Sequence, residues 1–158
     1  RSDVVASNSR LLDYAAGGGT LIVQDQRPPI WDALKPAPFP ATMGPGPRIT
    51  DENAAVTFTD PASPLLNFPN KISAHDFDNW VQERGLYFWE KWDDKYHTVL
   101  SMHDPGEKDL LGSLLWVRTG KGMYIYTGLS FSRQLPEGSA GAFRLFVNLL
   151  SQSRNTAK

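Results

Sequence analysis

One short segment, residues 76–97, concentrates side chains that could bind a ligand. It reads DFDNWVQERGLYFWEKWDDKYH and combines aromatic rings with carboxylates and one histidine. Flat rings can stack on the apolar faces of sugars, while carboxylate and guanidinium groups hydrogen-bond sugar hydroxyls. The candidate ligand-binding residues in this segment are Trp80, Glu83, Arg84, Trp89 and Trp92.

The same segment also has a structural interpretation, in which its aromatic side chains anchor it to a hydrophobic core. The anchors would be Phe77, Trp80, Tyr87 and Phe88. Trp89 and Trp92 stand among charged residues, a context that is typical of aromatic side chains on a surface. We therefore expect a structural belt with an exposed aromatic rim rather than a centre of catalysis.

A second group of reactive side chains follows predicted strands in the C-terminal half. Ser130 lies in GLSFS, which resembles the G-x-S-x-G nucleophile elbow but ends in serine. A nucleophilic serine needs a base and an orienting acid. A hydrolytic site would result if His103, Asp104, Ser130 and Arg133 converged beyond the strand ends. Alternatively, GLSFS is a tight strand-to-loop turn and Arg133 pairs with a carboxylate elsewhere.

The three histidines, at 75, 97 and 103, raise the question of a metal site. His75 and Asp78 have a helical spacing, but a stable site usually needs three or four ligands with supporting hydrogen bonds. Only short unlinked pairs are visible, so no metal or other cofactor is predicted. GGGT at residues 17–20 separates a helix from a strand, the reverse of the order in phosphate-binding loops, and is interpreted as a helix C-cap.

Composition indicates an ordinary globular domain. A length of 158 residues suits one domain, and 41% hydrophobic and 21% charged residues are typical of such domains. The net charge of −1 supplies no basic footprint, so nucleic-acid binding is not predicted. No apolar run is long enough to span a membrane. The absence of cysteine excludes disulfides and thiolate nucleophiles, and it leaves the compartment undetermined.

The N-terminal third is predicted to form a helix, a glycine turn, a buried strand and a long loop. Helical spacing over residues 4–15 follows Asp3, a suitable N-cap, and the glycines at 17–19 end the helix. TLIVQ at residues 20–24 is typical of a strand covered on both faces in a parallel sheet. Residues 25–50 hold seven of the twelve prolines and predict a structureless connection, either a functional loop or a mobile excursion.

Strands dominate the prediction for the rest of the chain. The expected elements are a strand at residues 54–59, a helix from 74 to about 82, a strand at 97–102, strands at 113–118 and 122–128, and a helix from about 138 to 151. Ser73 and Asp76 have the spacing of a capping box, and TGKG predicts a hairpin turn. The apolar stripe of the last helix would comprise Phe143, Phe146, Val147 and Leu150, widened by Leu145 and Leu149.

Most of the chain, residues 1–151, resembles the C-terminal region of large bacterial PIG-L-family deacetylase proteins. The resemblance is carried by NSRLLDYAAGGGTLIVQ, RITDENAAVTFTDPASPLL, DFDNWVQERGLYF and GSLLWVRTGKGMYIYTGLSFSRQLPEGSAGAFRLFVNLL. That region is similar to class I glutamine amidotransferase-like and ThuA-like domains. It implies a single α/β domain of the three-layer flavodoxin-like type, with a mostly parallel sheet, an antiparallel hairpin and a final helix. Residues 152–158 would form a polar tail.

The resemblance also implies a strand before the first helix, whereas the sequence given starts with the predicted helix. A helix that leads directly into a buried strand is normally the second half of a βαβ unit, so the order of these elements also predicts a preceding strand. The source would be bacterial, and an extracytoplasmic location is one option for a compartment that the sequence leaves open.

The possible functions are narrowed by the catalytic motifs of the related proteins that this sequence lacks. PIG-L deacetylases bind their metal through a His-Pro-Asp-Asp motif on a separate domain, and SAHDFD and MHDPGE match it only superficially. An amidotransferase needs a nucleophilic cysteine and a histidine after the last hairpin strand, and neither is present. We therefore expect a non-catalytic accessory domain that supports a catalytic deacetylase domain, in the parent chain or another subunit, or binds a glycan. The alternatives are the hydrolase outlined above and an oligomerisation module.

Overall fold

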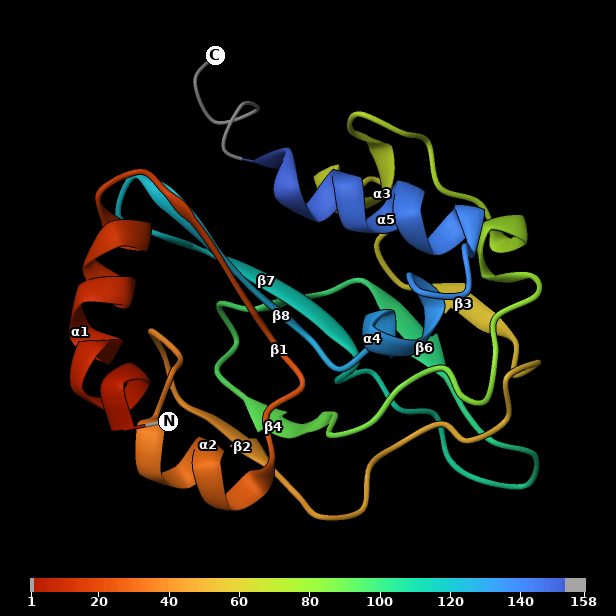
Figure 1. The fold of residues 1–158 in the computed structure, drawn as a ribbon, viewed down its shortest axis with the longest axis horizontal. Helices are drawn as coiled ribbons and strands as arrows, with labels where there is room; N and C mark the ends of the chain where they lie inside the picture. The colour runs from red at the N-terminus through yellow and green to blue at the C-terminus, as the bar shows by residue number, and fades with distance from the viewer. Residues whose placement is uncertain (1, 153–158) are drawn as a thin grey trace.

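The computed structural model describes residues 2–152 and has a mixed α/β architecture (Figure 1). Its main sheet has four strands in the order β1-β8-β7-β5. These strands are β1 (Thr20–Gln24), β5 (His97–Thr98), β7 (Leu114–Thr119) and β8 (Gly122–Thr127). β1 runs parallel to β8, whereas β7 is antiparallel to both of its neighbours. The α/β class is as predicted, but the sheet is mixed, with one parallel pair, rather than mostly parallel.

Two small antiparallel sheets accompany the main one. β2 (Ala41–Met43) pairs with β4 (Trp89–Trp92), and β3 (Val56–Phe58) pairs with β6 (Leu100–Met102). The strand that we expected at residues 97–102 is thus divided, because β5 belongs to the main sheet and β6 to a small one. Only the buried Val99 separates them, so a single residue links two sheets.

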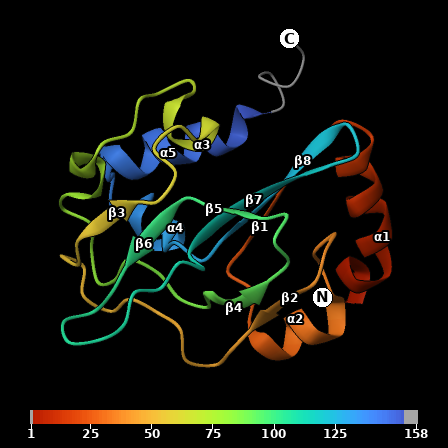
Figure 2. The same ribbon diagram turned by 180° about the vertical axis from the view of Figure 1, so that it is seen from behind.

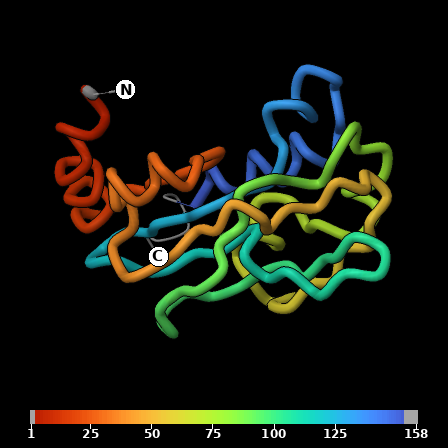
Figure 3. Tube along the Cα trace, turned by 90° about the horizontal axis from the view of Figure 1, so that it is seen from below, coloured from red at the N-terminus to blue at the C-terminus, as the bar shows by residue number. Residues whose placement is uncertain are grey.

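Helices cover both sides of the main sheet. They are α1 (Ser2–Ala16), α2 (Pro28–Leu34), α3 (Pro64–Asn67), α4 (Phe131–Gln134), α5 (Ala140–Leu150) and the 3-10 helix η1 (Ala74–Phe77). α1 and α2 lie on one side, and α3, α4 and α5 lie on the other, as the front and rear views show (Figures 1 and 2). Figure 3, from below, shows α1 at one end of the molecule and the segments around β3 and β6 at the other.

Among residues 2–152, none of the helices combines the length and the apolar character that crossing a lipid bilayer requires.

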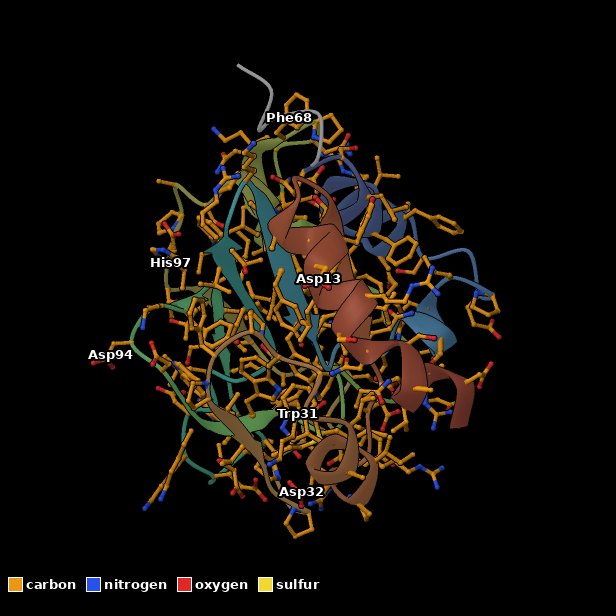
Figure 4. The ribbon with its side chains drawn as sticks, turned by 90° about the vertical axis from the view of Figure 1, so that its left-hand side faces the viewer. Asp13, Trp31, Asp32, Phe68, Asp94 and His97 are labelled. Atoms are coloured by element: carbon orange, nitrogen blue, oxygen red, sulfur yellow. The ribbon has the colours of Figure 1, made fainter. Side chains whose placement is uncertain are left out.

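The hydrophobic core has two parts, one on each face of the main sheet. Successive side chains of a strand point to opposite faces. Met123 and Ile125 of β8 therefore join the core under α3, η1 and α5. Tyr124 and Tyr126 join a second, aromatic core that includes Trp31 of α2. Figure 4 shows Trp31 within this second core, while Asp94 and His97 lie at the periphery.

The predicted long loop at residues 25–50 is wrong in its central part, because it contains α2 and β2. Pro28 and Pro29 occupy the first turn of α2, where a missing N–H and a fixed φ are tolerated. Lys35 ends the helix in a left-handed conformation. The prolines begin a helix here instead of preventing one.

The predicted helix at residues 74–82 lasts for a single 3-10 turn. The capping box of Ser73 and Asp76 is present as expected. Asn79 and Gln82, however, have φ values of 58° and 66°, which lie outside the right-handed helical region. At the other end of the chain, α1 begins at Ser2, so Asp3 lies in its first turn rather than at the N-cap.

The last helix is present as predicted, but its buried face differs from the expected stripe. α5 buries Ala142, Leu145, Asn148 and Leu149, whereas Phe143, Val147 and Leu150 are exposed. Apolar residues surround much of this helix, so spacing alone did not identify the inner face. The amide of Asn148 decides it, since its Nδ2 donates to the Leu65 and Asn70 carbonyls at 2.9 and 2.8 Å.

The boundary of the predicted tail also shifts. Gln152 is buried and its side chain donates to the carbonyls of Pro64, Phe68 and Asn148. Residue 152 therefore belongs to the folded body. The other residues of the predicted tail, 153–158, lie outside the described residues.

Candidate ligand-binding site

A polar cavity of about 430 Å³ lies at the carboxyl ends of the parallel strands β1 and β8. Its lining comprises Asp25, Arg27, Glu83, Leu86, Tyr87, Ser130, Ser132 and Arg133. Asp25 directly follows β1, and Ser130 follows β8 after a two-residue turn. In open α/β sheets ligands typically bind outside the carboxyl ends of the strands. The cavity therefore occupies the part of the fold where a ligand site is expected.

An ion pair between Glu83 and Arg133 forms one wall of the cavity. The Nε of Arg133 donates to the Glu83 carboxylate at 2.5 Å, and its Nη1 donates to the Gln82 side-chain carbonyl. Only 11% of the Glu83 side chain is exposed, and a carboxylate so buried requires a partner. Arg133 supplies it, which confirms that this arginine pairs with a carboxylate.

Ser130 places a hydroxyl beside this ion pair. Its backbone N–H donates to the Arg84 carbonyl at 3.0 Å, which fixes the start of α4 against the 81–87 segment. The residue is 6% exposed, and within residues 2–152 its hydroxyl forms no hydrogen bond. A serine hydroxyl can both donate and accept, so it is available to a molecule in the cavity.

Three residues around the cavity hold a left-handed backbone although they carry side chains. Asp25, Gln82 and Tyr87 have φ values of 57°, 66° and 59°. Such conformations cost about 1–3 kcal/mol each and cluster at functional sites, where the surrounding structure enforces them. Asp25 and Tyr87 line the cavity, and Gln82 binds Arg133. Three of the five non-glycine residues that have a positive φ among residues 2–152 therefore lie at this cavity, and the other two are Lys35 and Asn79.

Gln134 is one of the side chains that hold the strained segment. It is fully buried, and its Oε1 accepts from the Val81 N–H at 2.9 Å. Its Nε2 donates to the carbonyls of Val81 and Glu83 at 2.9 and 3.3 Å. The backbone on the N-terminal side of Glu83 is therefore fixed by an amide whose three hydrogen bonds are all satisfied within the protein.

Arg84 holds the same segment from the core side. Its Nε and Nη2 donate to the Ala54 carbonyl at 3.1 and 2.9 Å, and its Nη1 donates to the Phe77 carbonyl. Burial lowers the pKa of Arg84, while the charges of Asp51, Asp78 and Glu52 act in the opposite direction. The guanidinium points away from the cavity, so Arg84 is a positioning residue rather than the ligand contact that we expected.

Two glycines allow the 81–87 segment to lie directly on the end of β8. The Leu86 N–H donates to the Gly128 carbonyl at 2.8 Å. A Cβ added at Gly85 would lie 2.3 Å from the Gly128 carbonyl oxygen, and one at Gly128 would lie 2.4 Å from the Leu86 carbonyl oxygen. No other residue type fits at either position without a shift of backbone, so the 81–87 segment lies against the end of β8 only because both residues are glycine.

Tyr126 of β8 fixes the backbone of Tyr87 through a hydrogen bond. Its hydroxyl donates to the Tyr87 carbonyl, and its ring stacks on Trp89 with centroids 4.6 Å apart. Burial raises the pKa of Tyr126, and the charge of Asp25 raises it further. The phenol therefore stays protonated and remains a donor throughout the physiological range.

The aromatic residues predicted to bind a ligand do not reach the cavity. Trp80 is buried and its Nε1 donates to the Asp76 carbonyl at 3.0 Å. Trp89 is 2% exposed, so its assignment to an exposed rim is wrong. Glu90 and Lys91 of β4 are exposed, whereas Trp89 of the same strand is buried. Trp92 is half-buried and lines a separate hollow beside β2.

Of the five predicted ligand contacts, only Glu83 lines the cavity. The interpretation of the aromatic side chains as core anchors agrees better with the structure. Phe77, Trp80 and Phe88 are buried, and Tyr87 is half-buried. Asp25, Arg27 and Ser132 were not anticipated as site residues. For Asp25 and Arg27 a signal was available, since both follow a predicted parallel strand at its carboxyl end.

The four predicted hydrolytic residues lie in two separate places. Ser130 and Arg133 line the cavity, whereas neither His103 nor Asp104 does. Asp104 instead accepts hydrogen bonds from the Thr50 N–H, the Thr50 hydroxyl and the Asp51 N–H at 2.9, 2.7 and 2.9 Å. The exposed His103 contacts the Asp104 carbonyl through Nδ1 at 3.0 Å. The four residues therefore do not form one site.

The His75 and Asp78 side chains pair at 2.9 Å on the open surface. In the part of the chain that the structure describes, no group of three or more histidine, aspartate or glutamate side chains is arranged to hold a metal ion.

The buried hydrogen bonds of Asp104 lead to a pH-dependent prediction. Burial acts to raise the pKa of Asp104, but the hydrogen bonds from Asp51 and Thr50 and the nearby Arg48 hold it below its ordinary value. Its contribution to stability is therefore present above about pH 4 and is lost as the pH falls through the lower folded-state pKa. At pH 7 we expect Asp104→Asn to reduce the free energy of unfolding by about 1–3 kcal/mol.

Urea denaturation at pH 7 and at progressively lower pH measures this effect. The difference between the native chain and Asp104→Asn should shrink below about pH 4. Asp94→Asn, at an exposed turn, is the matched control and should change stability little at either pH. A difference for Asp104→Asn that is constant across the range would contradict the assignment.

Comparison with known proteins adds no assignment to this cavity. The chain matches no family model, no curated protein and no solved structure. The side chains of the site offer hydrogen-bond donors and acceptors on a fixed frame.

Proposed function

We propose that this chain is a non-catalytic, amidotransferase-like accessory domain of a PIG-L-type deacetylase protein, and that it binds a glycan in the cavity at the ends of β1 and β8. The proposed parent and the flavodoxin-like assignment rest on the sequence resemblance of residues 1–151. The glycan-binding part rests on the cavity, and above all on the Glu83–Arg133 ion pair beside the Ser130 hydroxyl.

The chemistry of the lining favours a neutral polyhydroxylated ligand. The charged groups are two carboxylates, Asp25 and Glu83, and two guanidinium groups, Arg27 and Arg133. Their charges cancel, so the cavity offers no net attraction to a phosphate or to another strongly charged group. Together with Ser130 they provide both donors and acceptors, which is what sugar hydroxyls require. The volume lies within the range of about 300–1,000 Å³ usual for ligand pockets.

A binding role is supported over a catalytic one by the surroundings of Ser130. Nucleophilic serines are activated by a base within hydrogen-bond reach. Among the described residues none is hydrogen-bonded to the Ser130 hydroxyl, and Glu83 is engaged by Arg133. The carboxylate and the guanidinium thus act as a fixed pair of ligand contacts.

The test is titration of the isotope-labelled chain with oligosaccharides of N-acetylglucosamine, followed by NMR chemical shifts and by calorimetry. We expect saturable shifts confined to residues 25–27, 83–87 and 130–133. Arg133→Ala should weaken binding at least about tenfold, because a charge-assisted hydrogen bond contributes about 1.5–3 kcal/mol.

Arg144→Ala is the matched control for this experiment. Arg144 also pairs with a carboxylate, Asp76, at 2.7 Å, but it lies on α5 and not in the cavity. Its loss should leave ligand affinity unchanged. If no sugar shifts any cavity resonance at millimolar concentration, or if both arginine variants weaken binding equally, glycan binding at this site is rejected and only the scaffolding role remains.

A further inference from the structure

Leu86 supplies the one aliphatic side chain among the described residues that line the polar cavity. It is half-buried, yet it packs against neither of the two hydrophobic cores. Its backbone N–H donates to the Gly128 carbonyl at 2.8 Å, so the residue has a fixed place in the wall of the cavity. Burial of this side chain by a ligand is favourable only if the ligand brings an apolar group of its own.

Glu83 adds a hydrogen-bond acceptor that the protein does not saturate. The Arg133 Nε donates to Oε1 of Glu83, and among residues 2–152 no donor is hydrogen-bonded to Oε2. An ionised carboxylate only accepts hydrogen bonds, so Oε2 requires a donor on the ligand. Because Arg133 already compensates the charge of Glu83, a neutral N–H group suits Oε2, and an ammonium group gains little net attraction there.

The Ser130 hydroxyl lies close to this carboxylate and completes a pair of polar contacts. Gly85 and Leu129 form a bridge, and the Ser130 N–H donates to the carbonyl of Arg84, the residue that follows Glu83. Ser130 lines the cavity and is only 6% exposed, and its hydroxyl has no hydrogen-bond partner in the described part of the chain. Such a hydroxyl can donate to a carbonyl oxygen of the ligand.

We infer that the cavity recognises the N-acetyl group of an amino sugar. This inference rests on the proposed function and specifies which glycan is bound. The amide N–H of the acetamido substituent donates to Oε2 of Glu83, its carbonyl oxygen accepts from the Ser130 hydroxyl, and its methyl group packs on Leu86. A plain sugar hydroxyl can replace the donor or the acceptor, but it brings no apolar group to Leu86.

Three oligosaccharide series with the same β-1,4 linkage test the inference. Oligomers of N-acetylglucosamine, glucosamine and glucose differ in the substituent at C2, which is an acetamido, an amino or a hydroxyl group. In calorimetric titrations at neutral pH, we expect the acetylated series to bind at least about tenfold more tightly than either of the other two. The reason is that only the acetamido group makes both the hydrogen bonds and the apolar contact.

Ser130→Ala tests the polar contact without removing a hydrogen bond from the folded protein. We expect the preference for the acetylated series over the glucose series to fall about fivefold, because one hydrogen bond to the acetamido carbonyl is lost. Ser139→Ala is the matched control. Ser139 lies outside the cavity and its side chain forms no capping hydrogen bond, so this variant should keep the full preference.

A ligand labelled with ¹³C in its acetyl methyl group locates the apolar contact directly. We expect nuclear Overhauser effects between this methyl group and the methyl groups of Leu86. Equal affinity for the acetylated and glucose series, tighter binding of the glucosamine series, or acetyl contacts that exclude Leu86 would overturn the inference while glycan binding itself stands. The absence of binding in all three series would reject both this inference and the proposed glycan binding.

Discussion

Replacement of Arg84 by methionine is expected to reduce the free energy of unfolding by about 3–5 kcal/mol. Arg84 is 5% exposed and satisfies the carbonyls of Ala54 and Phe77. Methionine fills similar space but leaves both buried carbonyls without a donor, and each unsatisfied group costs about 1–3 kcal/mol. Urea denaturation at neutral pH, with an unchanged m-value, measures the loss.

Arg84→Lys separates the charge of the side chain from its geometry. Lysine keeps a positive charge but offers a compact ammonium in place of the planar fork that reaches two carbonyls. We expect it to recover only part of the stability. A full recovery would show that the charge, through Asp51, Asp78 and Glu52, matters more than the hydrogen bonds.

The second large effect is predicted for Gly128→Ala. The added methyl group would lie 2.4 Å from the Leu86 carbonyl oxygen, so the 81–87 segment must move away from the end of β8. Because this segment is also fixed by Gln134 and Arg84, the displacement cannot be absorbed locally. We expect a loss of about 3 kcal/mol or more in the free energy of unfolding and the loss of sugar binding.

Gly46→Ala is the natural comparison for Gly128→Ala. A Cβ at Gly46 meets nothing within 4 Å, so this substitution should change stability by less than about 1 kcal/mol. Thermal and urea denaturation of the two variants measure the contrast directly. Equal stability of the two would mean that the close approach of Gly128 to Leu86 does not constrain the molecule.

Elements with strong local signals were predicted well from the sequence. β1 was located at residues 20–24, and the β7–β8 hairpin was located with its turn at Gly120, which has a φ of 55°. The Ser73–Asp76 capping box is present as expected. In each case a few adjacent residues determine the conformation, so the pattern and the structure agree.

Features that depend on distant contacts were not predictable in the same way. The inner face of α5 is selected by Asn148, whose partners lie some eighty positions earlier in the chain. Trp89 is buried because β4 pairs with β2 and because the Trp89 ring stacks on the ring of Tyr126. The charges beside Trp89 in the sequence give no indication of either contact.

The candidate site was predicted in part for the same reason. Glu83, Ser130 and Arg133 were recognised from their residue types, but nothing in their spacing indicated that they meet. Their convergence follows from the pairing of Gly85 with Ile49 and Leu129. The association of Ser130 with His103 failed because β6 turns into a separate small sheet.

The cavity is assembled from chain segments around residues 25, 83 and 130, and this order matters during synthesis. Ribosomes make the wall around residue 25 first and Ser130 and Arg133 last, so the chain must emerge at least as far as Arg133 before the pocket can close. Until then the Glu83 carboxylate lacks its Arg133 partner. Ligand binding would therefore show that α4 has been made and has packed against the 81–87 segment. Nascent or truncated chains that lack α4 should not bind the ligand.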